Sequence, residues 1–272
     1  MTFLNARIAL LALLWLLVSP VSATETWQAH TALNRHFKQA GLVGTIVVFD
    51  DASGAWAASD SARAYARYLP ASTFKIPNTL IALESGVVAD EQAVFKWDGK
   101  RRFLDAWNQD QTLQSAFQVS AVWTYQEIAR KVGAPAMQQY LWAFRYGNAR
   151  PTPKLDSFWL DGDLRISAVE QIEFLRRFNE GALPLSPRTT AIARRIMLRE
   201  EADGLRLFYK TGWADDAKPP IGWFVGWLER PAGKVYFALN MDMPKGMEQA
   251  PLREKIARAV LNELGYLPAR SN

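Results

Sequence analysis

The sequence predicts a mixed α/β fold, in which an antiparallel sheet is flanked by helices and carries an inserted helical lobe. Strand-like runs of β-branched and aromatic residues occur near the amino end and again near the carboxyl end, whereas residues 90–195 are helical in pattern. Because strands from both ends of the chain need partners, we expect them to pair in one sheet, with the middle of the chain folded beside it.

The first residues have the pattern of an export signal. Arg7 precedes the apolar run Ile8–Val18, and the small residues Val21-Ser22-Ala23 follow. The run is too short for a comfortable membrane span, which needs ~20 residues. We therefore expect residues 1–23 to be a signal peptide that is cleaved after Ala23. The mature protein is then expected to be secreted, in a bacterial periplasm, and not held in the membrane.

The composition of the chain favours one large domain. Hydrophobic residues make up 49% of the sequence, which includes 11 Trp, so a sizeable core can form. The absence of cysteine excludes disulfides, thiolate metal sites and a cysteine nucleophile. The net charge of +5 is dispersed rather than gathered in a stripe, so we expect no nucleic-acid partner. The composition does not distinguish a monomer from a homodimer.

The amino-terminal part is expected to hold a helix, two strands and a second helix. The pattern predicts a helix over Trp27–Ala40, a buried strand over Gly44–Asp50 and a short strand over Ala55–Ser59. A further helix is expected to begin near Ser72 and to run to about Glu84.

The rest of the chain is expected to be helical first and then strand-rich. The predicted helices are Leu113–Ser120, Thr124–Val132, Ala134–Phe144, Ala168–Glu180, Pro187–Leu198 and a closing helix over Pro251–Leu264. The predicted strands are Leu205–Thr211, Gly222–Glu229 and Lys234–Met241. The domain, residues 24–272, then divides into an α/β lobe of about residues 24–86 and 196–272 and a helical lobe of about residues 87–195.

The strongest candidate for chemistry is Ser72-Thr73-Phe74-Lys75, the only Ser-x-x-Lys in the chain. Residues three apart share a helix face, so the Ser72 hydroxyl and the Lys75 amine can meet. A helix start also offers unpaired N–H groups to a developing negative charge. With two histidines and no Gly-x-Ser-x-Gly elbow in the sequence, a Ser-His-Asp hydrolase is disfavoured. A solvated serine and lysine at a helix start is the alternative.

Other short motifs follow at intervals. They are Ser120-Ala121-Val122, Tyr146-Gly147-Asn148 and Lys210-Thr211-Gly212. Taken singly, each also suits an ordinary helix end, turn or strand end. Taken together with Ser72–Lys75 and Ser157-Phe158-Trp159-Leu160, their order and spacing resemble the class D, oxacillinase-type serine β-lactamases. The resemblance covers essentially the whole mature chain and implies the fold that these enzymes share with the penicillin-binding proteins.

The resemblance implies hydrolysis of β-lactam antibiotics through an acyl-enzyme on Ser72. Lys75 would carry a carbamate (N6-carboxylysine) formed with CO2 or bicarbonate, held by the Trp159 indole, and would act as the general base. No separate cofactor and no metal are implied. Burial can lower a lysine pKa by ~3 units, which leaves a neutral amine to react with CO2.

The remaining roles are also implied by the resemblance. Ser120 would relay the proton to the leaving nitrogen beside Lys210, and the backbone N–H groups of Ser72 and Trp213 would hold the oxyanion. Thr211 and Arg253 would bind the substrate carboxylate. The further residues expected to line the substrate site are Val122, Tyr146, Asn148, Leu160 and Gly212.

Two relatives of this chemistry are alternatives. A β-lactam sensor would be acylated without efficient turnover, and a transpeptidase would act on peptidoglycan. Transpeptidases usually carry Ser-x-Asn where this chain has Ser120-Ala121-Val122, which favours the class D enzymes.

Overall fold

The computed structural model describes residues 25–268 and is a seven-stranded sheet with helices on both faces. The predicted signal peptide, residues 1–23, lies outside the described residues. The order of the strands in the sheet is β1-β3-β2-β9-β8-β7-β6, so the amino-terminal strands pair with the last strand of the chain. The strands of this sheet are β1 Thr26–Ala29, β2 Gly44–Asp50, β3 Ala55–Ala58, β6 Leu198–Ala202, β7 Leu205–Ala214, β8 Ile221–Arg230 and β9 Gly233–Asp242.

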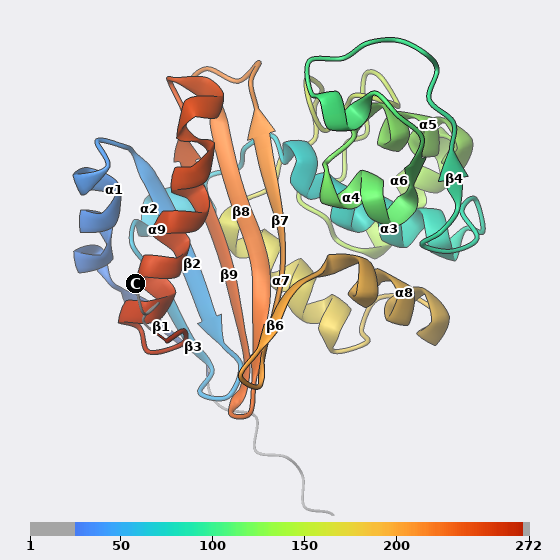
Figure 1. Cartoon of the computed structure of the whole chain (residues 1–272). Helices are drawn as coiled ribbons and strands as arrows, with labels where there is room; N and C mark the ends of the chain where they lie inside the picture. The colour runs from blue at the N-terminus through green and yellow to red at the C-terminus, as the bar shows by residue number, and fades with distance from the viewer. Residues whose placement is uncertain (1–24, 269–272) are drawn as a thin grey trace, which may run out of the picture.

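The helices separate into a group on the sheet and a group in a lobe beside it (Figure 1). They are α1 Arg35–Gln39, α2 Ser61–Tyr65, α3 Lys75–Glu84, α4 Leu113–Gln118, α5 Val122–Val132, α6 Ala134–Ala143, α7 Ala168–Asn179, α8 Pro187–Met197 and α9 Ala250–Glu263. Short 3-10 turns occur at η1 Thr31–Asn34, η2 Ala71–Phe74, η3 Asp105–Trp107 and η4 Gly246–Gln249. A small hairpin in the lobe pairs β4 Val94–Phe95 with β5 Gln111–Thr112.

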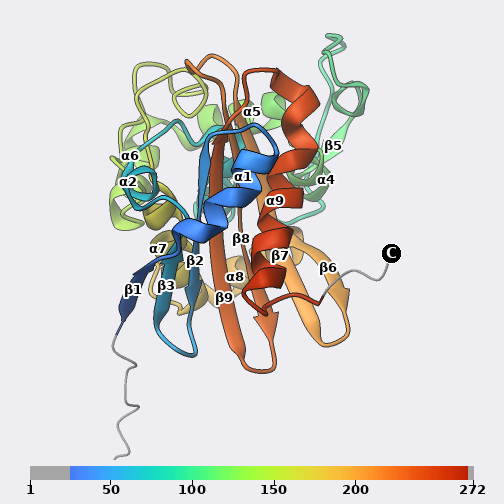
Figure 2. The same ribbon diagram turned by 90° about the vertical axis from the view of Figure 1, so that its left-hand side faces the viewer.

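The sheet buries both faces, which explains why β2 reads as a continuous apolar run. Alternate residues point to opposite faces of a strand. Ile46 and Val48 join the core under α1 and α9, which lie together on one face (Figure 2). Val47 and Phe49 join the larger core on the other face, which α7 covers. This larger core continues into the helical lobe.

The predicted fold class and most predicted elements are confirmed, and the capping box at the start of α7 forms as expected. The Ser167 Oγ accepts the Glu170 N–H at 3.2 Å, and the Ser167 N–H donates to Glu170 Oε2 at 2.9 Å. The helix α2, the strand β6 and the β4–β5 hairpin were not predicted from the sequence. The helix α7 falls in the range predicted for the helical lobe, yet it packs against β9, β2 and β8.

The predicted helix over Trp27–Ala40 is wrong in its first half. Trp27 lies in β1, which pairs in parallel with β3 and places Trp27 opposite Trp56. The indole of Trp27 lies 5.6 Å from that of Trp56 and 5.4 Å from the Tyr65 ring. Aromatic packing of this kind across a sheet edge outweighs the local helical spacing. The α-helix is confined to Arg35–Gln39.

The helix α3 is the central element of the lobe, and nearly all its residues are buried. It packs on α5, α6 and α8, while the turn η2 before it packs against β7. The active-site motifs predicted on η2, α3 and β7 therefore meet where the lobe joins the sheet. Among residues 25–268, no helix is both long enough and apolar enough to cross a membrane.

Candidate active site

Ser72 lies in the turn η2, immediately before α3. The Lys75 amine donates a 3.1 Å hydrogen bond to Ser72 Oγ, so the predicted contact within the Ser-x-x-Lys motif is present. Ala71, just before the serine, has a φ of 46°, in the left-handed region that non-glycine residues rarely adopt. The turn thus holds Ser72 in a local backbone conformation that the surrounding packing must stabilise.

Lys75 is fully buried, with 0% of its surface exposed. This burial lowers the pKa of its amine from 10.5 to about 7, because a charged ammonium loses its hydration there. Among the described residues, no carboxylate forms an ion pair with Lys75; its nitrogen lies 5.1 Å from the centre of the Tyr125 ring. About half of the amine is therefore neutral near pH 7.

Trp159 is also fully buried and lies against the same turn. Its indole stacks on Phe74, with the ring centres 5.2 Å apart, and its carbonyl oxygen accepts the Ala71 N–H at 2.9 Å. The Trp159 Nε1–H has no hydrogen-bond partner among the described residues. A buried donor without an acceptor is costly, so this atom marks a position where an acceptor group is expected.

Ser120 and Lys210 form the second polar contact of the site. The Lys210 amine donates to Ser120 Oγ at 2.9 Å and to the Thr211 carbonyl oxygen at 3.0 Å. Burial lowers the pKa of Lys210 well below its ordinary value, and the nearby positive charges of Lys75 and Arg253 lower it further. Ser120 has a φ of 63°, so this hydroxyl is also presented from a strained backbone.

Gly212 allows the sheet to approach the serine turn. A Cβ atom at this position would lie 2.9 Å from the Pro70 carbonyl oxygen and 3.2 Å from Thr73 Cγ2, which is closer than side-chain contacts normally come. The strand β6 pairs with β7 only as far as Phe208, so the carboxyl end of β7 is a free edge beside η2. The Gly212 carbonyl accepts a 2.6 Å hydrogen bond from Arg253.

These groups surround one cavity of about 390 Å³ at the junction of the lobe and the sheet. Eight of the predicted site residues line it, namely Ser72, Ser120, Val122, Leu160, Thr211, Gly212, Trp213 and Arg253. Arg253 is 8% exposed, and its burial lowers the pKa of the guanidinium to about 10, which leaves it charged at neutral pH. Three predicted site residues are buried and do not line the cavity, namely Lys75, Lys210 and Trp159. Lys75 contacts Ser72 and Lys210 contacts Ser120, both of which line it, and Trp159 packs against the turn that carries Ser72.

Tyr146 and Asn148, which were expected to bind substrate, do not line this cavity. Asn148 joins two loop segments, because its Nδ2 donates to the Asp163 carbonyl and its Oδ1 accepts the Arg165 N–H. Tyr146 is fully buried, and its hydroxyl donates to Gln171 Oε1 at 3.4 Å. Both residues are placed as supports of the site rather than as contacts to a ligand.

Gln171 is a residue of the site that the sequence analysis missed. Its amide Nε2 donates to Thr73 Oγ1 at 2.9 Å, and Thr73 Oγ1 donates to the Pro70 carbonyl at 2.7 Å. A buried hydrogen-bond chain thus runs from Tyr146 through Gln171 to the turn that carries Ser72. The one signal in the sequence is a polar glutamine on the otherwise apolar buried face of the amphipathic helix α7.

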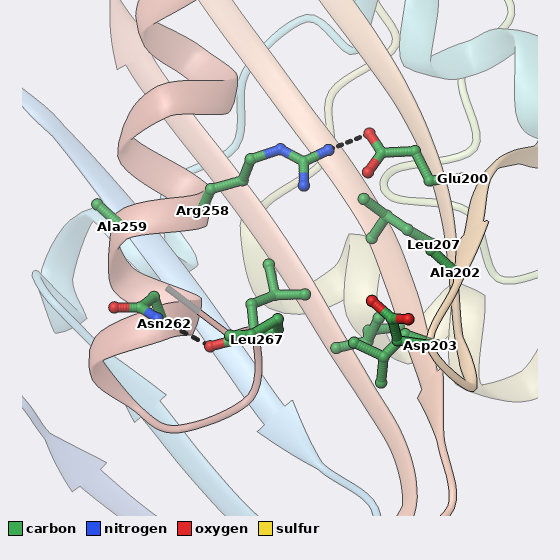
Figure 3. A pocket seen from close by; sticks show the side chains of 11 residues that line it. Glu200, Ala202, Asp203, Leu207, Arg258, Ala259, Asn262 and Leu267 are labelled. Atoms are coloured by element: carbon green, nitrogen blue, oxygen red, sulfur yellow. Dashed lines mark hydrogen bonds and ion pairs between the residues drawn. The ribbon is translucent and has the colours of Figure 1, made fainter. Parts of the chain in front are cut away.

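A second cavity, of about 400 Å³, lies between α9 and the strands β6 and β7. Figure 3 shows Arg258 reaching from α9 toward Glu200, with Leu207 and Leu267 below them. No serine or lysine lines this cavity. Of these two cavities, only the first is lined by Ser72 and Ser120, the two serines that contact the buried lysines.

The comparisons with known proteins agree with this geometry. The family profile of the penicillin binding protein transpeptidase domain matches residues 44–262. The chain is 40% identical to the β-lactamase OXA-48 of Klebsiella pneumoniae over 96% of this chain and 100% of that one. It is 42% identical to the β-lactamase OXA-20 of Pseudomonas aeruginosa, over 96% of this chain and 98% of that protein. The chain belongs to the class D β-lactamase family.

Solved structures of this family have the same fold. The class D β-lactamase YbXI from Nostoc superposes with a TM-score of 0.84 at 40% identity, and covers 86% of this chain and 99% of its own. The class D β-lactamase from Sebaldella termitidis gives a TM-score of 0.86 at 34% identity, over 90% and 100% of the two chains. The family predicted from the order of the motifs is confirmed, and the protein is an enzyme of this hydrolase class.

Proposed function

We propose that this enzyme hydrolyses β-lactam antibiotics through an acyl-enzyme on Ser72, with Lys75 carbamylated by CO2. The observation that carries the proposal is the 3.1 Å contact between Ser72 Oγ and an amine whose pKa burial lowers to about 7. The relatives and solved structures described above are named as β-lactamases, which supports β-lactams as the substrate class. We also propose export to the periplasm after removal of residues 1–23, as the sequence pattern predicts.

The residues around Lys75 fit a carbamate. A neutral amine is the form that reacts with CO2, and about half of Lys75 is neutral near pH 7. The unpartnered Nε1–H of Trp159 would donate to the carbamate, which is an acceptor. The carbamate would supply a general base beside Ser72, for attack on the lactam and for activation of the deacylating water.

The chain's own groups account for the acylation step. Ser72 gives its hydroxyl proton to the base at Lys75 as its Oγ forms a bond to the lactam carbonyl carbon. The backbone N–H groups of Ser72 and Trp213 stabilise the oxyanion; one such donor is typically worth ~3–4 kcal/mol. The carbon–nitrogen bond of the lactam then breaks, and Ser120 passes the proton to the ring nitrogen. The Lys210 amine holds the Ser120 hydroxyl at 2.9 Å for this transfer.

Substrate is held by the walls of the same cavity. Arg253 stays charged at neutral pH and lines the cavity next to Thr211, so these residues would bind the carboxylate that β-lactams carry beside the ring. Val122 and Leu160 would contact the apolar part of the ring system. Attack by water on the ester carbonyl finally releases the opened product and restores Ser72.

Turnover of a penicillin and of the chromogenic cephalosporin nitrocefin tests the proposal. The mature protein should hydrolyse many equivalents of substrate, and Lys75→Ala should abolish turnover. Enzyme decarbamylated at low pH should regain activity when bicarbonate is added. A single stoichiometric burst would instead indicate a sensor or a transpeptidase, and a full rate that is indifferent to bicarbonate would contradict the carbamate.

A further inference from the structure

The active-site cavity carries opposite charges at its base and at its mouth. Arg253 lines the base, next to the buried Lys210. Asp161, Asp215 and Asp216 line the same cavity, and all of them are exposed. Asp161 directly follows Leu160, whereas Asp215 and Asp216 lie in the connection from β7 to β8. The acidic rim, defined here as these three aspartates, therefore comes from both sides of the junction.

The carboxylates of the acidic rim are available to a ligand. Within residues 25–268, none of them forms an ion pair or accepts a side-chain hydrogen bond. Asp161 and Asp216 also border a neighbouring hollow that contains Arg67, Arg165 and Lys218.

The two arginines of that hollow are directed to other acceptors. Arg67 is paired with Glu170, and the Arg165 guanidinium donates to the carbonyl oxygens of Gly162 and Leu164. Lys218 is exposed and makes no ion pair with the rim among the described residues. No cation among the described residues is therefore paired directly with the acidic rim.

A buried hydroxyl without a partner lies on the same side of the cavity as Asp161. Ser157 lines the cavity beside Leu160 and is only 9% exposed, yet its Oγ has no hydrogen-bond partner among the described residues. A buried hydroxyl left unpaired is costly, and a ligand group that bonds it removes that cost.

The cavity also offers apolar area at its mouth. Phe103 is 70% exposed and packs edge-on against Trp107, and Met247 is 44% exposed. All three residues line the cavity. A side chain that combines an aromatic group with a positive charge would therefore find both of its partners here.

We propose that the enzyme prefers β-lactams whose side chain carries a cationic group, with the ring carboxylate at Arg253 and the cation at the acidic rim. This inference rests on the proposed β-lactam hydrolysis and names the substrate class of that site. A unit charge about 7 Å from one exposed carboxylate changes binding by about two- to threefold in water. The whole rim should therefore favour a cation over a neutral group by about tenfold, and an anion should be disfavoured to a similar extent.

A matched series of penicillins tests the preference. Ampicillin, benzylpenicillin and carbenicillin differ at the α-carbon of the side chain, which bears an amino group, hydrogen or a carboxylate. The measurement is kcat/KM for each, at about pH 6.5, where an α-amino group is mainly protonated. The kcat/KM for ampicillin divided by that for carbenicillin should fall at least tenfold in the triple variant Asp161→Asn, Asp215→Asn, Asp216→Asn. A general loss of activity cancels in this ratio.

The control removes equal charge at the other end of the sheet. Asp51→Asn, Glu201→Gln and Asp203→Asn replace exposed carboxylates that make no ion pair among the described residues. The strand register places them away from the cavity, and this triple variant should leave the ratio unchanged. The ratio in the unmodified enzyme should also fall with added salt.

The outcomes separate this inference from the proposed function. Turnover of benzylpenicillin with an ampicillin-to-carbenicillin ratio that the rim substitutions leave unchanged would overturn the charge preference alone. An equal fall of the ratio in the control variant would show a general charge effect and would also overturn it. Failure to turn over any of the penicillins would overturn the proposed function, and the preference with it.

Discussion

The Lys75 nitrogen lies 3.1 Å from Ser72 Oγ, inside a part of the protein where it has no exposed surface. Because the amine is buried, its protonated form loses hydration and is costly. The pKa of Lys75 is about 7 in the folded protein and 10.5 as its ordinary value. Between these values the unfolded chain binds more protons than the folded one, so stability from this group increases as pH rises from 7 toward 10.5.

The first prediction concerns the stability cost of Lys75. At pH 7 this group should destabilise the fold by about 4 kcal/mol relative to its fully neutral state. In CO2-depleted buffer, Lys75→Met should therefore be more stable than the unmodified protein near pH 7, and the difference should shrink as the pH rises toward 10. Urea unfolding at several pH values measures this difference in the free energy of unfolding. The exposed Lys38, replaced in Lys38→Met, serves as the control and should show no such trend.

A gain in stability that is independent of pH would contradict this prediction, because hydrophobic replacement alone carries no proton linkage. The expected pattern places Lys75 among residues that are kept for function at a cost in stability.

The part of the site that lies within one turn could be predicted from the sequence. The spacing of Ser72 and Lys75 brings the two side chains to one face, and a local rule suffices for this. Lys210 and Ser120 are 90 positions apart, and their 2.9 Å contact depends on how the lobe is seated on the sheet. Only the resemblance to a known family placed that pair together.

Tertiary packing explains the sequence-based errors. The strand Gly44–Asp50 was predicted with its observed bounds, since β-branched residues and burial on both faces point to the same structure. Trp27 was assigned to a helix from its spacing, but it pairs across the sheet edge with Trp56. The position of Tyr146 away from the cavity also depends on tertiary packing, because its hydrogen bond to Gln171 joins two separate segments.

The second prediction isolates the indole donor of Trp159. Trp159→Phe keeps an aromatic ring against Phe74 and removes only the unpartnered Nε1–H. We expect a higher bicarbonate concentration for half-maximal activity and a slower deacylation, by about tenfold or more, because the acceptor on Lys75 loses a charge-assisted bond. Stopped-flow acylation and steady-state turnover, each across a bicarbonate series, separate the two steps.

The matched control for Trp159 is Trp223→Phe. Trp223 is equally buried, but its Nε1 donates to the Leu69 carbonyl at 2.8 Å. Loss of this bond leaves a buried carbonyl unpaired, so this variant should lose more stability than Trp159→Phe, by about 1 kcal/mol. Its bicarbonate dependence should not change. Equal bicarbonate dependence in the two variants would contradict the proposal that the Trp159 Nε1–H binds the carbamate on Lys75.

The third prediction concerns Gln171, which supports the serine turn without touching the cavity. Gln171→Leu removes the 2.9 Å bond to Thr73 Oγ1 and the acceptor of the Tyr146 hydroxyl. Stability should fall by about 1–3 kcal/mol, because buried polar groups lose their partners. Because Ser72 lies in the same turn as Thr73, the acylation rate constant measured by stopped flow should fall about tenfold or more. The dissociation constant of the noncovalent substrate complex, taken from the same experiment, should change little.

Gln111→Leu distinguishes positioning from general destabilisation. Gln111 is 1% exposed and its amide donates to the Ala106 carbonyl at 2.8 Å, within the helical lobe. We expect a comparable loss of stability with an acylation rate close to that of the unmodified enzyme. If both variants lower acylation equally at matched stability, the hydrogen-bond chain from Tyr146 does not position Ser72. If only Gln171→Leu does so, the geometry of the nucleophile depends on a residue almost a hundred positions away in the sequence, on the helix that packs against the sheet.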